Sequence, residues 1–198
     1  MNAVPSIRAL PILIFCEAKL SPSLGYVSDP RWLEPYESLV SMLWKFAWMN
    51  RLAGHVVAEH VAARAVDPYE GVAGSATDVD VLRVAATLGV KRKTVRQALT
   101  IRDKPHSALR FCCRCMAHGY HSVVHQFGYI ASCPVHDCAL ATTCPGCGAA
   151  SPYRLDARLL GAPFRCAQCG RRYANTSFAH RKSLSQQART AIVRAALC

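Results

Sequence analysis

The residues best suited to chemistry in this sequence are cysteines and one histidine that occur in pairs, with two residues between the members of each pair. Four such pairs follow one another: Cys112 with Cys115, Cys133 with His136, Cys144 with Cys147, and Cys166 with Cys169. A turn of this kind directs two ligands at one metal ion, and two turns complete the tetrahedron that structural zinc prefers. The spacing therefore predicts two zinc ions per chain, held by these eight residues.

The four pairs can combine in two ways. If neighbouring pairs combine, 17 residues separate the halves of the first unit and 18 separate those of the second, as in ribbon-type zinc sites. A cross-braced arrangement joins the first pair to the third and the second to the fourth. We favour the sequential arrangement. Gly148 and Gly170 follow the last cysteine of their turns, where a residue without Cβ can adopt positive φ and close the turn.

Other cysteines and histidines lie outside these pairs. Disulfides are disfavoured for the pairs themselves, because a histidine cannot join one. Cys113 could substitute for Cys112, but the cysteines left over are expected to be unligated thiols: Cys16, Cys113, Cys138 and Cys198. Three histidines near the first unit could compete as ligands, although packed or solvent-exposed side chains are favoured: His118, His121 and His125.

The basic residues are concentrated in the second part of the chain. The sequence has 198 residues and a formal net charge of +12. Residues 1–77 carry 6 Lys or Arg and 7 Asp or Glu, whereas residues 78–198 carry 18 Lys or Arg and 5 Asp or Glu. Such an excess predicts that this second part contacts a polyanion or another acidic partner.

Residues 78–99, DVDVLRVAATLGVKRKTVRQAL, have the pattern of a helix-turn-helix. Ala85 is small where two helices would touch, and Gly89 follows at the turn. The second helix would present to duplex DNA the residues Lys91, Arg92, Lys93, Thr94 and Arg96. Arg171 and Arg172, just after the last metal turn, could add phosphate contacts. The alternative is an ordinary helical hairpin with a solvated basic face.

The predicted fold is α plus small zinc ribbon: a helical region over residues 1–109 with the helix-turn-helix, followed by two consecutive treble- or ribbon-type zinc-binding units over 110–174. Helical spacing predicts a helix over 36–50, with Gly54 as its stop signal, and a second over 55–66. A basic C-terminal helix is expected over about 183–197, within the last region, 175–198. Its apolar side would carry Ala188, Ile192 and either Ala195 or Ala196. Lys45 is expected to tolerate alanine with little loss of stability.

The start of the chain shows no membrane or secretion signal. The apolar stretch over residues 9–16 is interrupted by Pro11 and is far shorter than the roughly 20 residues that a membrane helix requires. The first eight residues carry one arginine, and no small-residue cleavage site follows. Together with thiols at metal-binding spacing, this predicts a cytoplasmic protein without membrane contact.

No catalytic constellation is evident. The carboxylates from residue 78 onward do not form a ligand set for two-metal phosphoryl transfer: Asp78, Asp80, Asp103, Asp137 and Asp156. The His-x-Glu signature of nucleobase deaminases does not occur. Four protein ligands on each zinc would leave no open position for an activated water. We therefore predict a binding protein and not an enzyme.

Several motifs together resemble the TniQ family of transposition proteins, in a short member. They are YESLVSMLWKFA over residues 36–47, RFCCRC over 110–115, GYHS over 119–122, CPVH over 133–136, Leu140, and CPGCG over 144–148. The resemblance covers roughly residues 33–174. Lys45 stands where the family often has arginine, and Cys113 where it often has proline.

The resemblance implies a non-catalytic adaptor that selects the target of DNA transposition. Such a protein binds target DNA, or an RNA-guided targeting complex on it, and recruits an AAA+ ATPase. The alternative is a transcriptional regulator that reads DNA through the helix-turn-helix and uses the zinc units as a partner surface.

Overall fold

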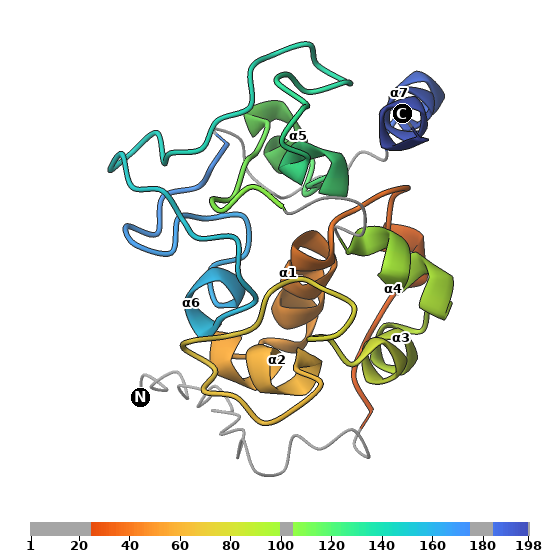
Figure 1. Cartoon of the computed structure of the whole chain (residues 1–198), viewed down its shortest axis with the longest axis vertical. Coiled ribbons are helices and arrows are strands. Elements are labelled where there is room, and N and C mark those ends of the chain that lie inside the picture. Colours follow the sequence, from red (N-terminus) through yellow and green to blue (C-terminus); the bar gives the residue numbers. More distant parts are fainter. Residues whose placement is uncertain (1–24, 100–104, 175–183, 198) are drawn as a thin grey trace, which may run out of the picture.

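The protein is mostly helical, and loops carry most of the metal-binding residues (Figure 1). The computed structural model describes residues 25–99, 105–174 and 184–197. Within these ranges β structure consists of isolated antiparallel bridges, such as Thr143 with Ala150 and Arg165 with Arg172. The apolar stretch over residues 9–16, Cys16 and Cys198 lie outside the described residues. Over the described ranges, no helix combines the length and the apolar character that crossing a membrane requires.

Helix α1 (Leu39–Asn50) lies at the centre of the helical half, after the short 3-10 helix η3 (Pro30–Trp32). The hydroxyl of Ser38 caps it by accepting a hydrogen bond from Ser41 N at 3.2 Å. All residues from Leu39 to Ala47 are buried. The helix predicted over 36–50 therefore begins three residues later, because Ser38 takes the N-cap position. It ends at Arg51, which adopts φ 52°.

Gly54 opens helix α2 (Gly54–Val61), so its interpretation as a stop signal is wrong. A Cβ atom at this position would lie 2.0 Å from the carbonyl oxygen of Ala157, the first residue of α6 (Ala157–Leu160). The missing side chain allows the two backbones to touch, and α2 and α6 pack against each other. The second predicted helix ends at Val61, five residues before the expected boundary.

Helices α3 (Val81–Leu88) and α4 (Arg92–Ala98) are joined by three residues. Gly89 ends α3 with φ 64°, as the turn prediction requires. Apolar residues of both helices are buried in the same hydrophobic cluster, with exposed fractions of 2% for Leu88 of α3 and 0% for Val95 of α4. The structure thus contains the predicted pair of packed helices. Its use as a DNA-binding helix-turn-helix stays a prediction.

Two hydrophobic clusters hold the fold together. The larger cluster contains residues of the four helices α1, α2, α3 and α4 together with aromatic residues of the second metal-binding segment. Trp44 of α1 packs on Phe164, with ring centroids 4.9 Å apart. The smaller surrounds α5 (Cys113–Ala117), the 3-10 helix η4 (Val123–Gln126) and α7 (Gln186–Leu197). From α7 it buries the predicted apolar face: Ala188, Ile192 and Ala196.

Lys45 is buried, which contradicts the expectation that it tolerates alanine. Only 4% of its surface is exposed, and its ammonium lies 2.5 Å from a carboxylate oxygen of Glu37, which is fully buried. The same ammonium donates to the carbonyl oxygen of Trp32 at 2.6 Å. Helical spacing could not reveal this, because the partner of Lys45 lies before the helix, where the chain folds back over it.

We expect Lys45→Met to lower the free energy of unfolding by about 3–5 kcal/mol, because it leaves the carboxylate of Glu37 buried without its cation. The double variant Glu37→Gln with Lys45→Met removes both charges and should recover part of this loss. Denaturant unfolding measures both effects. An unchanged midpoint for Lys45→Met would show that the ion pair is not formed.

Candidate metal centres

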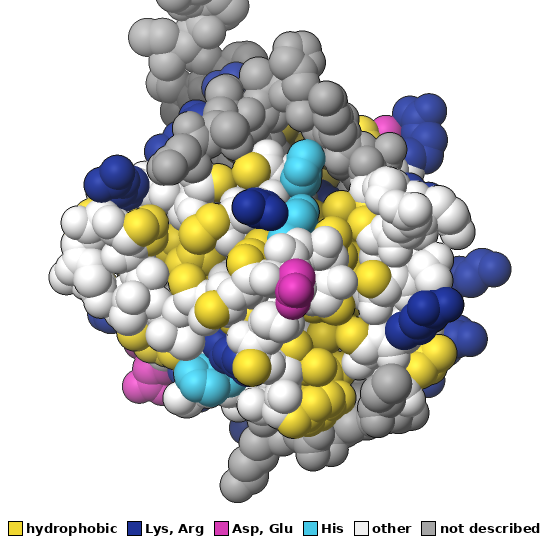
Figure 2. All heavy atoms as spheres, turned by 90° about the horizontal axis from the view of Figure 1, so that it is seen from above, with side chains coloured by type: hydrophobic (Ala, Val, Ile, Leu, Met, Phe, Trp, Pro, Cys, Tyr) yellow, Lys and Arg dark blue, Asp and Glu magenta, His cyan; other side chains and the backbone are white. Residues whose placement is uncertain are grey.

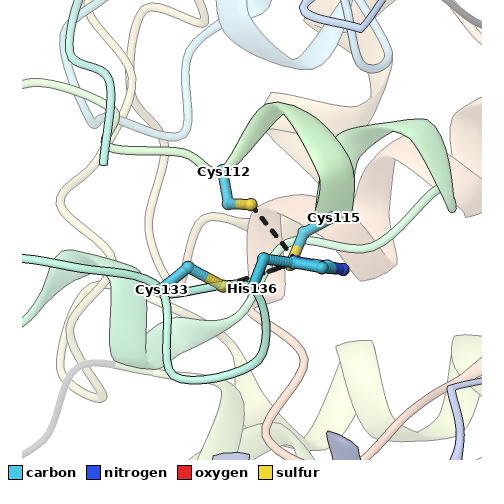
Figure 3. A group of neighbouring side chains, drawn as sticks. All are labelled: Cys112, Cys115, Cys133 and His136. Carbon is cyan, nitrogen blue, oxygen red and sulfur yellow. Dashed lines mark hydrogen bonds between the residues drawn. The ribbon is translucent and has the colours of Figure 1, made fainter. Parts of the chain in front are cut away.

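The first centre consists of Cys112, Cys115, Cys133 and His136, whose ligand atoms all lie within 4.8 Å of one another. Figure 3 shows the four side chains pointing toward one point, the first two from the start of α5 and the others from a loop. The sulfur atoms of Cys115 and Cys133 are 3.6 Å apart. The Nδ1 atom of His136 lies 3.3 Å from Cys115 Sγ and 3.4 Å from Cys112 Sγ.

The second centre consists of four cysteines, Cys144, Cys147, Cys166 and Cys169, with sulfur atoms within the same 4.8 Å limit. Two sulfur contacts in this centre join different turns: Cys144 with Cys169 and Cys147 with Cys166, both at 3.7 Å. Cys144 and Cys166 are buried, whereas Cys147 and Cys169 are exposed. Neighbouring pairs thus come together in both centres, which is the sequential arrangement.

Three of the four turns have the same backbone hydrogen bonds. In each turn, the carbonyl oxygen of the first cysteine accepts a hydrogen bond from the backbone N–H of the residue that follows the second ligand. These donors are Asp137 at 2.8 Å, Gly148 at 2.9 Å and Gly170 at 2.9 Å. All three donors have positive φ, at 46°, 73° and 69° respectively. The prediction for the two glycines is therefore confirmed.

Asp137 shows that sequence reasoning missed one such position, because it looked for glycine alone. Asp is among the few other residues that tolerate the left-handed region, so its place directly after the ligand His136 is the signal that could have found it.

The fourth turn is helical. Cys112 is the N-cap residue of α5, and Cys115 lies within that helix. The carbonyl of Cys112 accepts from Met116 N at 2.9 Å, and the carbonyl of Cys115 accepts from Tyr120 N at 3.1 Å. The first centre therefore joins a helix to a loop, while the second joins two loops.

Both ligand sets fit a tetrahedral metal ion. An ion with bonds to sulfur of 2.3 Å places neighbouring sulfur atoms about 3.8 Å apart, close to the separations of 3.6 and 3.7 Å found here. Without an ion the thiols must share protons, and hydrogen bonds from Cys112 and Cys115 lower the pKa of the Cys133 thiol to about 3. A cation would offset the negative charge of thiolates held this close together, so each centre can bind one metal ion.

The residues that could have competed as ligands of the first centre do not belong to its cluster of ligand atoms. Cys113 is exposed at the start of α5, and Cys112 occupies the cluster. His121 and His125 are buried beside each other, with ring centroids 5.2 Å apart. His118 lies parallel to the ring of His136 at 6.4 Å between centroids.

A buried polar network connects the first centre to α1. The hydroxyl of Ser38 lies 2.6 Å from His121 Nδ1, and His121 Nε2 lies 2.7 Å from the carbonyl oxygen of Arg110. A carbonyl only accepts, so Nε2 carries the proton and Nδ1 accepts from Ser38. Burial lowers the pKa of His121 to about 3 and that of His125 to about 4, which keeps both rings neutral. The segment leading into Cys112 is thereby fixed to the N-terminus of α1.

The residues predicted to contact DNA fall into two separate groups. The basic side chains of α4 and of its N-cap residue are exposed: Lys91, Arg92, Lys93 and Arg96. Thr94 is half-buried and lines a cavity with Arg189. Arg171 is exposed and packs over Gly146, and Arg172 is half-buried in a cavity beside Lys45. Helix α4 and the second centre lie on opposite sides of α1 (Figure 1). The fold therefore does not bring the two groups together.

No protein-family model matches the chain, and no curated protein sequence matches it.

We expect Cys133→Ser and Cys147→Ser each to remove one equivalent of metal, because each takes a thiolate from a different centre. Metal binding in such sites contributes about 10–16 kcal/mol of apparent free energy in isolated peptides, so the affected unit should lose cooperative unfolding. Elemental analysis and thermal unfolding measure the two effects.

The matched control is Cys113→Ser, which changes an exposed thiol next to the first centre and should leave both quantities unchanged. Unchanged metal content in Cys133→Ser or Cys147→Ser would contradict the ligand assignment.

Proposed function

We propose that the chain is a non-catalytic adaptor for DNA transposition that holds two structural zinc ions, binds target DNA or a targeting complex, and recruits an AAA+ ATPase. The proposal rests on the metal centres, on the contacts between the residues that resemble the TniQ family, and on the exposed basic residues of α4.

Zinc is the metal that suits both centres. Three thiolates with one imidazole, and four thiolates, are typical ligand sets of structural zinc. All four positions in each set come from the protein, so neither site offers a place for an activated water. Loops with isolated bridges carry most ligands, and structural zinc supplies folding free energy to such segments. The two ions have a structural role in this proposal.

The observation that carries the proposal is that two of the resembling motifs, far apart in the sequence, meet in one buried network. Glu37 and Ser38 precede α1, whereas His121 and Ser122 lie more than 80 residues later. The backbone N–H of Ser38 donates to the carbonyl of His121 at 2.8 Å, and the hydroxyl of Ser122 donates to the carbonyl of Tyr36 at 3.1 Å. Glu37 also accepts from the hydroxyl of Ser41 at 2.6 Å. Two of the resembling motifs, over residues 36–47 and 119–122, therefore form a single structural unit.

Helix α4 is the favoured contact with DNA. Seven thiolates and two zinc ions would reduce the net charge from +12 to about +9, so a large basic excess remains. Figure 2 shows the end of the molecule near α5 and α7, where Lys and Arg side chains lie apart from one another, most of them at the edge, and hydrophobic side chains lie over the middle. Among the described residues of that face the basic side chains do not form a compact patch, whereas α4 and its N-cap residue Lys91 concentrate four exposed basic residues within a stretch of six.

We expect weak, salt-dependent binding to random-sequence duplex DNA, with a dissociation constant of roughly micromolar at physiological salt. Four to six phosphate contacts predict a slope of log affinity against log salt of about −4 to −5. Arg92→Ala with Arg96→Ala should reduce the steepness of that slope by about 2, as measured by fluorescence anisotropy.

The matched control is Arg114→Ala with Arg158→Ala, which removes two exposed arginines outside α4. This variant should retain the affinity of the parent. Equal binding by the α4 variant and the parent would mean that DNA is contacted elsewhere.

The recruitment step is tested by co-assembly of the zinc-loaded protein with an AAA+ transposition ATPase on DNA, followed by size-exclusion chromatography. A stable complex is expected for the adaptor. Tight binding of the protein alone to one palindromic duplex, without ATPase binding, would instead indicate the transcriptional regulator.

A further inference from the structure

Cys138 lies at the first metal centre without belonging to its four ligands. Its sulfur atom is 3.4 Å from the sulfur of Cys112, closer than the 3.6 Å between the ligands Cys115 and Cys133. Cys138 is partly exposed, whereas only 1% of Cys112 is exposed. The centre therefore places an accessible thiol in contact with a buried ligand.

The fold does not need a thiol at this position. In the three loop turns the first cysteine donates its N–H, at 2.8 Å in each case, to the carbonyl of the residue five positions later: Cys138, Ala149 and Arg171. These residues are structurally equivalent, and they serve the turn through the backbone alone. Alanine and arginine fill the position at the second centre, so the sulfur of Cys138 adds chemistry to the first centre that the second lacks.

We propose that Cys138 and Cys112 form a redox-sensitive pair that opens the first metal centre when a hydroperoxide oxidises it. The proposal rests on the metal binding proposed above for this centre. A disulfide bond is 2.03–2.05 Å long, so the two sulfur atoms must approach by about 1.4 Å. Because they belong to α5 and to the loop, the bond would cross-link the two halves of the site.

The step has a defined balance of atoms and electrons. The sulfur of Cys138 loses its proton and attacks one peroxide oxygen, which breaks the O–O bond, forms a sulfenic acid and releases hydroxide. The sulfur of Cys112 then attacks the sulfur of Cys138, which forms the S–S bond and releases a second hydroxide. The thiol proton and one solvent proton convert both hydroxides to water. Two electrons pass from the sulfurs to hydrogen peroxide, and Cys112 no longer offers a thiolate ligand.

The test treats the reduced, zinc-loaded protein with hydrogen peroxide. Mass spectrometry of alkylated peptides should identify a disulfide between Cys112 and Cys138. A chromogenic chelator should detect release of one of the two zinc ions, while the second centre keeps its ion. Cys138→Ser should retain both ions at the same peroxide dose, and Cys113→Ser, which changes an exposed thiol next to Cys112 in the sequence, should behave as the parent.

Two outcomes overturn the proposal while leaving the metal centres intact. One is a protein that contains two zinc ions but forms no bond between Cys112 and Cys138. The other is Cys138→Ser losing zinc as fast as the parent. A reduced protein without zinc would instead remove the basis of this proposal and of the proposed zinc centres together.

Discussion

The convergence of four ligand atoms at each of two points is the constraint on which the rest of the structure depends. Residues 110–174 contain two short helices, one 3-10 turn and isolated bridges, and the described part of this segment has no longer run of paired backbone. Loops of this kind lose much conformational entropy on folding and recover little of it from hydrogen bonds. The ligand clusters connect the loops at fixed points. Aromatic residues of these loops can then pack, as Tyr173 and Phe111 do with ring centroids 4.3 Å apart.

The two clusters stabilise different parts of the molecule. Cys144 and Cys166 belong to the same hydrophobic cluster as α1 to α4, so the second centre is built into the helical core. Cys112, Cys115 and Cys133 belong to the cluster that contains Ile192 of α7. The buried contact between Ser38 and His121 then joins the two parts at the start of α1. Damage to one centre is therefore expected to affect a different set of helices from damage to the other.

Sequence reasoning located the features that depend on local spacing. A short window of sequence reveals three of these features: the ligand pairs, Gly89 at the turn between α3 and α4, and the apolar face of α7. The sequence predictions were wrong where the role of a residue depends on a partner outside its local pattern. Lys45 looks like a surface residue until Glu37 folds against it, and Gly54 looks like a stop signal until α6, about 100 residues later, packs on it. No spacing rule could place Cys138 against Cys112, because that contact exists only after the two halves of the centre meet.

The long separation between contacting residues also bears on how the chain folds during synthesis. The indole of Trp44 donates to the carbonyl of Leu159, 115 positions later, and the N–H of Leu184 donates to Glu34, 150 positions earlier. Contacts across such distances form late, because the intervening chain must first be ordered. Helix α1 is synthesised early, yet the part of its apolar surface around Trp44 lacks its partner Leu159 until the chain is 115 residues longer. A nascent chain halted before residue 159 would expose Trp44, and exposed apolar surface of this kind favours aggregation of incomplete chains.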